Sequence, residues 1–367
     1  MIPFCDLSRK QSRYQGAIRD NIDRVLKSGW YILGPELEMF EGKFAAYLKV
    51  KHVVGVNSGT DAIHLALRSL GVGAGDEVIT VSNTATPTVS AIRMTGAIPV
   101  FVDILPDTNN LNPSGLKAAL TSKSRAIVPV HLYGYPAAMD EILKFARKHN
   151  LWVVEDACQA HGARFNGRMI GTLGDIGCFS FYPTKNLGAL GDSGAVATAS
   201  LKISNKIRSL RNYGEIAKYS NAIEGVNSRL DEVQAALLNW GVDYLDQWNK
   251  ERSELAKLYI AQLGSGFVEL PDRGNANCQR VWHLFVIKTT RRDELRQFLC
   301  KEGIQTMIHY PKPVHAQRAY RFLQYKNIHL PETVRASKHI LSLPLYPEMA
   351  TSEVLEVSKA VLRFYEK

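Results

Sequence analysis

The sequence lacks any apolar run that approaches the roughly 20 residues of a membrane-spanning helix. Its first residues, Met1-Ile-Pro-Phe-Cys-Asp-Leu, lack the basic region followed by an apolar region that marks a signal peptide. Cysteine is scarce: there are five, odd in number and widely spaced, so they do not form a disulfide framework. Such cysteines are typical of a reducing compartment. We therefore expect a cytoplasmic protein without a membrane partner.

Long runs of lysine and arginine are also missing, although the net charge of the 367-residue chain is +10. A basic protein favours anionic partners, but these positive charges are scattered as on an ordinary helical surface. Charge alone does not choose between nucleic acid and an anionic small molecule, such as a nucleotide or a phosphate; together with the motifs further along the chain, it leads us to expect no nucleic-acid partner. A hydrophobic content of 46% is sufficient for a large core.

Short runs rich in Val and Ile alternate with amphipathic stretches of helical length. This alternation predicts βαβ units around a buried, mostly parallel sheet, so the expected fold class is α/β. The expected strands are Val53–Val56, Glu77–Val81, Ile98–Val102, Ala126–Val130, Leu151–Val154, Ile176–Ser180 and Ala195–Ala197. The expected helices among them are Asp61–Leu70, Pro87–Thr95, Pro113–Leu120 and Met139–His149.

The pattern changes in the last third of the chain. Leu, Val, Ala and Trp at helical spacing predict one long helix over residues 231–262. A strand at Trp282–Lys288, a helix at Arg291–Glu302 and a final helix from Ser352 follow. We interpret residues 1–245 as a large α/β domain with an N-terminal arm and residues 246–367 as a smaller α+β domain.

A dinucleotide-binding glycine fingerprint is absent from the place where it is needed. Gly71-Val-Gly-Ala-Gly resembles one, but it ends a predicted helix, whereas the fingerprint follows a strand and opens a helix. Its glycines are better explained as a helix C-cap and a turn. A nicotinamide-dependent oxidoreductase is therefore disfavoured. A non-catalytic regulator on the same fold is disfavoured too, because it would need an appended DNA-binding segment.

The segment Asn57-Ser-Gly-Thr-Asp lies between a predicted strand and a predicted helix. In this context, free backbone N–H groups and the helix dipole hold an anion. Gly59 allows the backbone to approach closely, and the hydroxyls of Ser58 and Thr60 add donors. Ser180, at the end of another strand, can supply a further hydroxyl. For Ser58 and Thr60 the alternative is ordinary capping of the helix.

An apolar strand ends in acids at Leu151-Trp-Val-Val-Glu-Asp, so Asp156 lies at the carboxyl end, where ligands of open α/β sheets bind. A carboxylate there can keep a pyridine nitrogen protonated, which makes the ring a better electron sink. Gln159 can reach a ring substituent. His161 can act as a base or contact a hydroxyl, with a structural role as the alternative. Cys158 and His161 have the spacing of metal ligands, but no second pair accompanies them, so we assign no metal site.

Lys185 follows an apolar strand and lies among the Pro and Gly residues of the turn in Ser180-Phe-Tyr-Pro-Thr-Lys-Asn-Leu-Gly. A lysine that loses its proton on desolvation can form a Schiff base. Taken alone, Lys185 is more simply explained as a solvated loop residue. In combination with Asp156 and the phosphate-binding turn at residues 57–61, it predicts a pyridoxal phosphate site.

Six ordered motifs resemble those of the DegT/DnrJ/EryC1/StrS sugar aminotransferases, which are pyridoxal phosphate enzymes of fold type I. The resemblance covers essentially the whole chain. The motifs are Asn57-Ser-Gly-Thr-Asp-Ala, Glu155-Asp-Ala-Cys-Gln-Ala-His-Gly-Ala, Ser180-Phe-Tyr-Pro-Thr-Lys-Asn-Leu-Gly, Gly225-Val-Asn-Ser-Arg-Leu-Asp-Glu-Val-Gln-Ala-Ala, His309-Tyr-Pro-Lys-Pro-Val-His and Leu341-Ser-Leu-Pro-Leu-Tyr-Pro-Glu-Met.

The resemblance implies roles for the residues that match these motifs. Lys185 is expected to form the Schiff base with pyridoxal 5'-phosphate, and Asp156 to hold the pyridine nitrogen; these are the two expected catalytic residues. Further residues are expected to bind the cofactor through its phosphate or its ring: Ser58, Gly59, Thr60, Gln159, Ser180 and Asn227.

Asn227 resembles the family residue that crosses from one subunit to the phosphate in the other. The resemblance therefore implies a homodimer with shared active sites, although Asn227 also suits the capped start of a helix. Candidates for contact with the substrate, for which packing in the core or a loop is the alternative, are His161, Tyr182, Tyr213, Tyr219, Arg229, His309 and Tyr310.

One feature departs from the family pattern. Many members place an aromatic residue over the cofactor ring in the turn after the second strand, but here Ser82-Asn-Thr-Ala-Thr-Pro-Thr has Ala85 near that place. We therefore name no residue that stacks on the ring.

The resemblance implies transfer of the amino group of L-glutamate to a keto sugar carried on a nucleoside diphosphate. Relatives with histidine in place of Lys185 resemble dehydratases, so the lysine disfavours dehydration. The turn Ser82–Thr88 and the segment from Lys218 to Asp231 look most like the branch that aminates carbon 3 of dTDP-3-keto-6-deoxyhexoses, giving dTDP-3-amino-3,6-dideoxyhexoses. Amination at carbon 4 of a 4-keto-6-deoxyhexose is the alternative.

Overall fold

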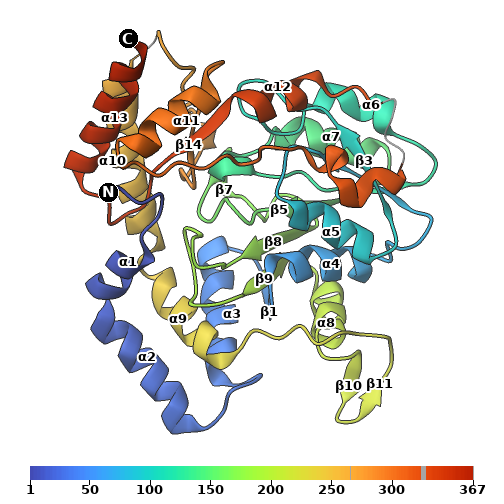
Figure 1. Cartoon of the computed structure of the whole chain (residues 1–367). Coiled ribbons are helices and arrows are strands. Elements are labelled where there is room, and N and C mark those ends of the chain that lie inside the picture. The colour runs from blue at the N-terminus through green and yellow to red at the C-terminus, as the bar shows by residue number, and fades with distance from the viewer. Residues whose placement is uncertain (265, 324–327, 367) are drawn as a thin grey trace.

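The computed structural model describes residues 1–264, 266–323 and 328–366. Its centre is a seven-stranded sheet in the order β1-β9-β8-β5-β4-β2-β3 (Figure 1). Strand β9 runs antiparallel to β1 and β8, and the other neighbouring strands are parallel. The predicted mostly parallel α/β sheet is therefore confirmed. The strands are β1 (His52–Val56), β2 (Glu77–Val81), β3 (Ile98–Val102), β4 (Ser124–Ile127), β5 (Trp152–Asp156), β8 (Ile176–Ser180) and β9 (Gly194–Thr198).

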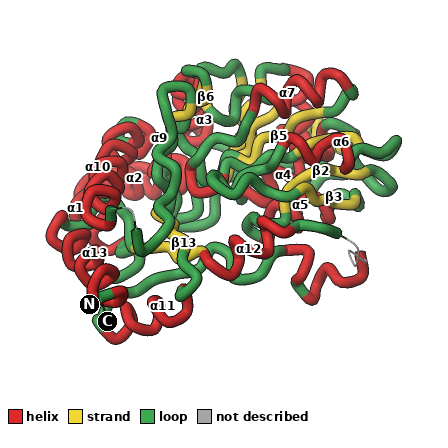
Figure 2. Tube along the Cα trace, turned by 90° about the horizontal axis from the view of Figure 1, so that it is seen from above, coloured by secondary structure: helices red, strands yellow, loops and turns green. Residues whose placement is uncertain are grey.

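Helices cover both faces of this sheet because its strands are apolar on both sides. In β1, Val54 and Val56 pack into the core beneath α4, whereas Val53, which precedes them, packs into the core beneath α3. Seen from above, α7 lies on one side of the strands, and α4 and α5 lie on the other (Figure 2). These helices are α3 (Pro35–Leu48), α4 (Gly59–Ser69), α5 (Thr86–Met94), α6 (Leu116–Ala119), α7 (Met139–Lys148), α8 (Leu201–Leu210) and α9 (Glu232–Val242).

The predicted long helix over residues 231–262 is two helices, α9 and α10 (Leu245–Leu263). The N–H groups of Asp243 and Tyr244 bond to carbonyls three residues back instead of four, so the last turn of α9 tightens and the helix ends. The break gathers Trp240, Tyr244 and Trp248 around the ring of Tyr14, at centroid distances of 5.1, 5.4 and 5.9 Å. Packing of these aromatic rings overrides a continuous helical pattern.

A second hydrophobic core lies in the C-terminal part of the chain, where α10 packs with β13 (Phe285–Lys288) and β14 (Ile340–Leu343). Ile2 joins this core, and both chain ends lie on the left-hand side of the molecule in Figure 1. The strand predicted at Trp282–Lys288 is thus shorter than expected. The division at residue 245 stays a prediction. The other helices here and in the N-terminal segment are α1 (Leu7–Arg13), α2 (Gln15–Ser28), α11 (Arg292–Lys301), α12 (Pro331–His339) and α13 (Thr351–Tyr365).

Short elements connect these units. They are the strands β6 (Arg164–Phe165), β7 (Arg168–Met169), β10 (Glu215–Ala217), β11 (Ser220–Asn221) and β12 (Cys278–Gln279), and the 3₁₀ helices η1 (Pro113–Gly115), η2 (Leu132–Gly134), η3 (Val314–Ala316) and η4 (Arg318–Leu323). Gly71, in the glycine-rich segment that resembles a dinucleotide fingerprint, follows the end of α4 with φ of 82°. As predicted, this segment is a turn.

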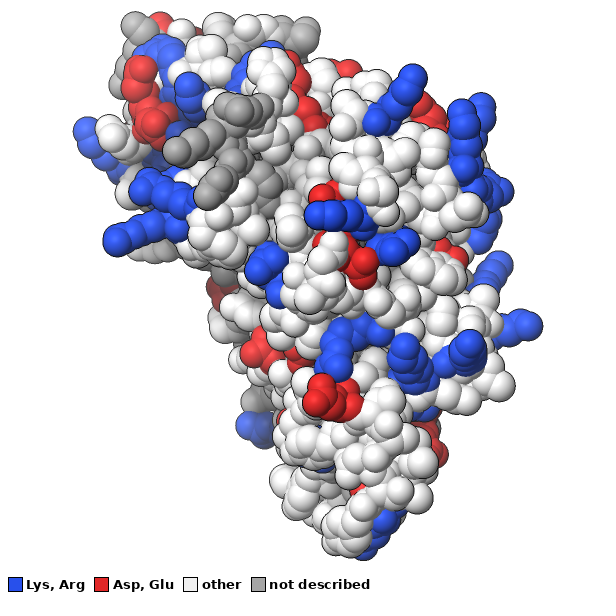
Figure 3. All heavy atoms as spheres, turned by 90° about the vertical axis from the view of Figure 1, so that its right-hand side faces the viewer, with Lys and Arg blue, Asp and Glu red and all other residues white. Residues whose placement is uncertain are grey.

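The surface charge is dispersed on the face shown in Figure 3. Lysine and arginine side chains are spread over it, with acidic side chains and uncharged surface between them. Within the described residues, no helix is both long and apolar enough to cross a membrane.

Candidate active site

A cavity of about 260 Å³ lies at the carboxyl end of β5, where α/β folds bind their ligands. The first turns of α4 and α5 and the loop between β8 and β9 form its walls. The residues predicted to form the site that line this cavity are Ser58, Gly59, Thr60, Asp156, Gln159, Ser180, Tyr182 and Lys185. Ser58 and Lys185, which are 127 positions apart in the sequence, therefore face one space.

Asp156 is the last residue of β5 and is only 5% exposed. Its Oδ2 accepts a hydrogen bond from Thr88 Oγ1 at 2.7 Å, and its Oδ1 accepts one from the Cys158 N–H at 3.2 Å. Both donors are neutral. The carboxylate is therefore oriented, while its charge stays available to a cationic group of a ligand.

Lys185 lies in the loop that connects β8 to β9. Its N–H donates to the Tyr182 carbonyl at 2.8 Å, and the loop is closed at its base by the bond from Phe181 N–H to the Ser193 carbonyl, also 2.8 Å. Burial lowers the pKa of Lys185 below its usual value, and the nearby Cys158 and Asp156 oppose this shift. Among the ion pairs of the described residues, none involves Lys185. A lysine in this setting reaches the neutral form that nucleophilic and basic chemistry need more readily than an exposed lysine does.

The N-terminus of α4 forms another wall of the cavity. Ser58 caps the helix, accepting a hydrogen bond from Asp61 N–H at 3.1 Å, so the alternative reading of Ser58 as a capping residue holds as well. Backbone N–H groups in the first turn of a helix lack partners within the helix and attract anions. Gly59 is packed closely: an added Cβ would lie 2.6 Å from Ser180 Cβ and 2.9 Å from Cys158 Sγ.

Gln159 is held from both ends of its amide. Its Oε1 accepts from the Tyr133 N–H at 2.8 Å, and its Nε2 donates to the Tyr310 hydroxyl at 3.2 Å. Burial raises the pKa of Tyr310 to about 12. Tyr310 therefore lies one hydrogen bond behind the cavity wall. Its neighbour His309 bonds to Ser342 Oγ at 2.8 Å, and burial, together with the charge of Lys185, lowers its pKa to about 4.

His161 is completely buried and does not line the cavity. Its ring lies between Phe179 and Phe181, with centroid distances of 5.7 and 5.6 Å, and neither ring nitrogen has a hydrogen-bond partner among the described residues. Burial, with the charge of Lys185, lowers its pKa to about 3. This position suits the structural alternative for His161 better than contact with a substrate.

Four predicted site residues lie on another surface. Asn227 is exposed, Tyr213 and Tyr219 are 49% and 87% exposed, and Arg229 reaches back to Asn212 Oδ1 at 3.2 Å. None of the four lines the cavity of Lys185 within this chain. The neighbouring Ser228 links this segment to α4, because its hydroxyl donates to Asp61 Oδ2 at 2.7 Å.

Sequence reasoning missed several residues that line the cavity. Thr88 matters most, since its hydroxyl contacts both Thr84 Oγ1, at 2.8 Å, and Asp156. The sequence of the turn that contains it indicates a missing aromatic residue and a likeness to one branch of the family, but a helix-start threonine carries no signal of a bond to Asp156. The other missed lining residues are Ile63, Thr84, Ala85, Pro87, Val130, Cys158 and Asp192.

These groups fit pyridoxal phosphate. A buried carboxylate suits the ring nitrogen, a lysine with a lowered pKa suits the aldehyde, and hydroxyls beside a helix N-terminus suit the phosphate. Ala85 and Pro87, in the turn where the family resemblance implies an aromatic residue, line the cavity. The fold and the cavity together define a pyridoxal-phosphate-dependent aminotransferase.

Comparison with known proteins gives the family. The model of the DegT/DnrJ/EryC1/StrS aminotransferase family matches residues 13–362. The chain belongs to the DegT/DnrJ/EryC1/StrS aminotransferase family.

Relatives and solved structures agree with this assignment. The chain is 46% identical to dTDP-3-amino-3,4,6-trideoxy-alpha-D-glucose transaminase of Streptomyces venezuelae, covering 100% of this chain and 97% of the relative. It is 45% identical to dTDP-3-amino-3,6-dideoxy-alpha-D-galactopyranose transaminase of Aneurinibacillus thermoaerophilus, covering 99% of each. The crystal structure of S. venezuelae DesV in complex with a ketimine intermediate matches with a TM-score of 0.97, 46% identity and coverage of 100% and 99%.

A Bacillus subtilis structure with bound pyridoxamine phosphate also matches, with a TM-score of 0.92, 34% identity and coverage of 99% of this chain and 85% of that chain. The protein is therefore an enzyme, and its cofactor is pyridoxal phosphate. The predicted family, fold, enzyme class and cofactor are confirmed.

Proposed function

We propose that the enzyme transfers the amino group of L-glutamate to carbon 3 of a dTDP-linked 3-keto-6-deoxyhexose, giving a dTDP-3-amino-3,6-dideoxyhexose. The observation that carries this proposal is the identity of 45–46% over essentially the whole chain with two transaminases named for 3-amino sugars linked to dTDP. The dispersed positive charge of the chain supports a substrate with a diphosphate.

Lys185 is the proposed acid and base. Its Nζ takes a proton from the carbon that carries the amino group of the donor and returns a proton to the sugar carbon that receives the amino group. The lowered pKa supports this role, because a base must be neutral at working pH to accept a proton. When bound, pyridoxal phosphate supplies the electron sink that stabilises negative charge at the reacting carbon.

Asp156 is the proposed partner of the cofactor's ring nitrogen, with its carboxylate held in place by Thr88 and Cys158. Gln159, fixed by Tyr133 and Tyr310, is proposed to lie beside the ring. The phosphate is assigned to the groups around the start of α4 and the end of β8, which are Ser58, Gly59, Thr60 and Ser180.

We propose a homodimer in which each subunit completes the other's site. The support is the exposure of Asn227 and of the large apolar side chains near it, since apolar surface of this kind marks interfaces. The apolar residues in question are Tyr213, Ile216, Tyr219 and Ile223. A partner that covers them would bring Asn227 to the phosphate, and Arg229, Tyr213 and Tyr219 to the substrate.

Tyr182, His309 and Tyr310 remain proposed substrate contacts from the same chain, and Tyr182 is the one that lines the cavity directly. For His161 we propose the structural role rather than substrate contact, because its ring packs against Phe179 and Phe181. All five cysteines are unpaired, which supports the proposed cytoplasmic location.

The test is product analysis by mass spectrometry and NMR. The enzyme is incubated with L-glutamate and, in separate reactions, a dTDP-3-keto-6-deoxyhexose and a dTDP-4-keto-6-deoxyhexose. We expect an amino group at carbon 3 from the first substrate and at least tenfold lower kcat/KM for the second. A higher kcat/KM for the 4-keto sugar would overturn the assignment to carbon 3 while leaving the aminotransferase class intact.

A further inference from the structure

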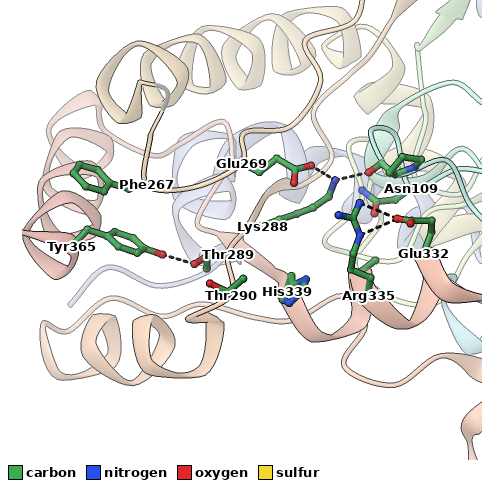
Figure 4. A pocket seen from close by; sticks show the side chains of 12 residues that line it. Asn109, Phe267, Glu269, Lys288, Thr289, Thr290, Glu332, Arg335, His339 and Tyr365 are labelled. Atoms are coloured by element: carbon green, nitrogen blue, oxygen red, sulfur yellow. Dashed lines mark hydrogen bonds and ion pairs between the residues drawn. The ribbon is translucent and has the colours of Figure 1, made fainter.

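A second cavity, of about 310 Å³, lies between the loop after β3, strand β13 and helix α12 (Figure 4). We call it the C-terminal trough and define it by Asn109, Glu269, Lys288, Glu332 and Arg335. None of the residues that line it also lines the cavity of Lys185. The trough is therefore a separate place where a ligand can bind.

Asn109 gives the first indication that the trough is built for a ligand. The residue is only 6% exposed, yet its Oδ1 has no hydrogen-bond partner among the described residues. Its backbone is fixed by a bond from its N–H to the Leu105 carbonyl, at 2.9 Å, with φ of 59°. Leaving a buried acceptor unpaired is costly. The site therefore lacks a hydrogen-bond donor at this atom.

The charges of the trough form opposite pairs. Lys288, whose side chain is 12% exposed, donates to Glu269 and to the Pro106 carbonyl, which anchors the loop that carries Asn109. Arg335 contacts a single atom, Glu332 Oε2, with both Nε, at 2.9 Å, and Nη2, at 2.8 Å. Among the described residues, Arg335 Nη1 and Glu332 Oε1 have no partner of their own. The second pair thus keeps one donor and one acceptor for a ligand.

This arrangement selects a ligand with both charges. A simple anion would meet Glu269 and Glu332 as well as the cations, and a simple cation would meet Lys288 and Arg335. A zwitterion can satisfy both signs without separating either pair. In Figure 4, Asn109, Glu332 and Arg335 lie at the same end of the view, so one small head group can contact all three.

We propose that the C-terminal trough binds the zwitterionic head group of a free α-amino acid. The ammonium group donates to Asn109 Oδ1 and Glu332 Oε1, and the carboxylate accepts from Arg335 Nη1. The side chain extends along the trough past Ala336 and His339. This site is additional to the one where the enzyme's amino donor reacts.

The test is isothermal titration of the holoenzyme with glycine, L-leucine and L-histidine, while the cofactor absorbance is recorded in parallel. Saturable binding of at least one of them, without a change in the cofactor band, is expected. N-acetyl-L-leucine, which lacks the ammonium group, and L-leucinamide, which lacks the carboxylate, are expected to bind at least tenfold more weakly than L-leucine.

Two variants test the assigned contacts. Asn109→Gly removes the side chain and tolerates the positive φ, and Arg335→Gln changes a half-exposed residue that does not threaten the fold. Each should weaken binding about tenfold, whereas Lys338→Gln, on the exposed side of α12, should leave it unchanged. The proposal is overturned if no amino acid binds, if binding always shifts the cofactor band, if N-acetyl-L-leucine binds as well as L-leucine, or if both variants keep full affinity.

Discussion

Lys185 and Lys288 are partly buried lysines in two different cavities, and the protein holds them in opposite ways. Lys288 donates to a carboxylate and to a backbone carbonyl. Lys185 belongs to none of the ion pairs found in the described residues, and burial lowers its pKa. A paired lysine keeps its charge and fixes a structure, whereas a desolvated lysine without a paired carboxylate is available as a base and nucleophile.

The acids of the two cavities differ in the same way. Glu332 is paired with Arg335 at 2.8 Å, while Asp156 is oriented only by the neutral donors Thr88 and Cys158. The cavity of Lys185 thus holds single charges that require a ligand to complement them. The trough holds charges that are already balanced, which suits a ligand of zero net charge.

The largest expected effect comes from removing the unpaired lysine. Lys185→Ala should lower kcat by about 10⁴-fold or more, because both proton transfers lose their acid and base. The measurement is turnover under saturating glutamate and keto sugar. Lys257→Ala, which removes an exposed lysine paired with Glu254 on α10, is the matched control and should keep normal turnover. Comparable turnover in Lys185→Ala and the control would contradict the claim that the unpaired Lys185 differs in role from a paired lysine.

The next largest effect is expected from the unpaired acid. Asp156→Asn keeps the shape of the side chain but removes its charge, and kcat should fall by about 10²- to 10³-fold. Thr88→Val leaves the charge and removes one orienting hydrogen bond, so its effect should be smaller. Rate measurements on both variants separate charge from orientation. A larger loss in Thr88→Val than in Asp156→Asn would contradict this role for the charge.

A buried histidine near Lys185 provides a pH-dependent prediction. The pKa of His161 is about 3 in the folded protein, against an ordinary 6.5. Between these values the unfolded chain binds a proton that the folded chain does not. The stabilising contribution is therefore complete above about pH 6.5 and is lost as the pH falls toward 3.

Lowering the pH from 7 to 5 should thus destabilise the wild type by about 2 kcal/mol through His161 alone. In His161→Leu this part of the pH dependence should disappear. Urea unfolding at both pH values measures this change in the free energy of unfolding. Because the change is taken within each protein, it is independent of any general loss of stability in the variant. If the wild type and His161→Leu lose the same unfolding free energy between pH 7 and pH 5, His161 is not a neutral buried group.

The smallest expected effect concerns the helix start in the cofactor cavity. Ser58→Ala should cost about 1 kcal/mol of stability through the lost cap. It should also weaken binding of pyridoxamine phosphate about tenfold, because a phosphate donor is lost. Ser200→Ala is the matched control: Ser200 caps α8, accepting from Ile203 N–H at 3.3 Å, and does not line the cavity. Equal cofactor affinity in both variants would show that Ser58 caps the helix but does not bind the phosphate.

Much of the fold was predictable because the strands of a buried parallel sheet have continuous apolar sequences. The strands β2, β3 and β8 have the predicted bounds. The break between α9 and α10 was not predictable, since it depends on Tyr14, which is more than 200 residues away in the sequence. A helical pattern records which face is apolar but does not record what packs on that face.

The site shows the same limit. Asp156, Lys185 and the 57–61 turn could be proposed from the sequence because each lies at a strand end or a helix start, where the context restricts its possible roles. Thr88 and the unpaired Asn109 were not, because a hydrogen bond, or the lack of one, arises only when distant segments meet. The proposed crossing of Asn227 to a partner depends on a second chain and stays a prediction.

The measurement that tests the central claim most directly is a single-turnover absorbance experiment on the holoenzyme. Glutamate is added first and then, after its removal, a dTDP-3-keto-6-deoxyhexose. We predict that the visible cofactor band is lost with glutamate and restored by the keto sugar in the wild type, and that Lys185→Ala completes neither change. If the variant completes both changes at the wild-type rate, Lys185 is not the acid and base, and the account of the cavity fails.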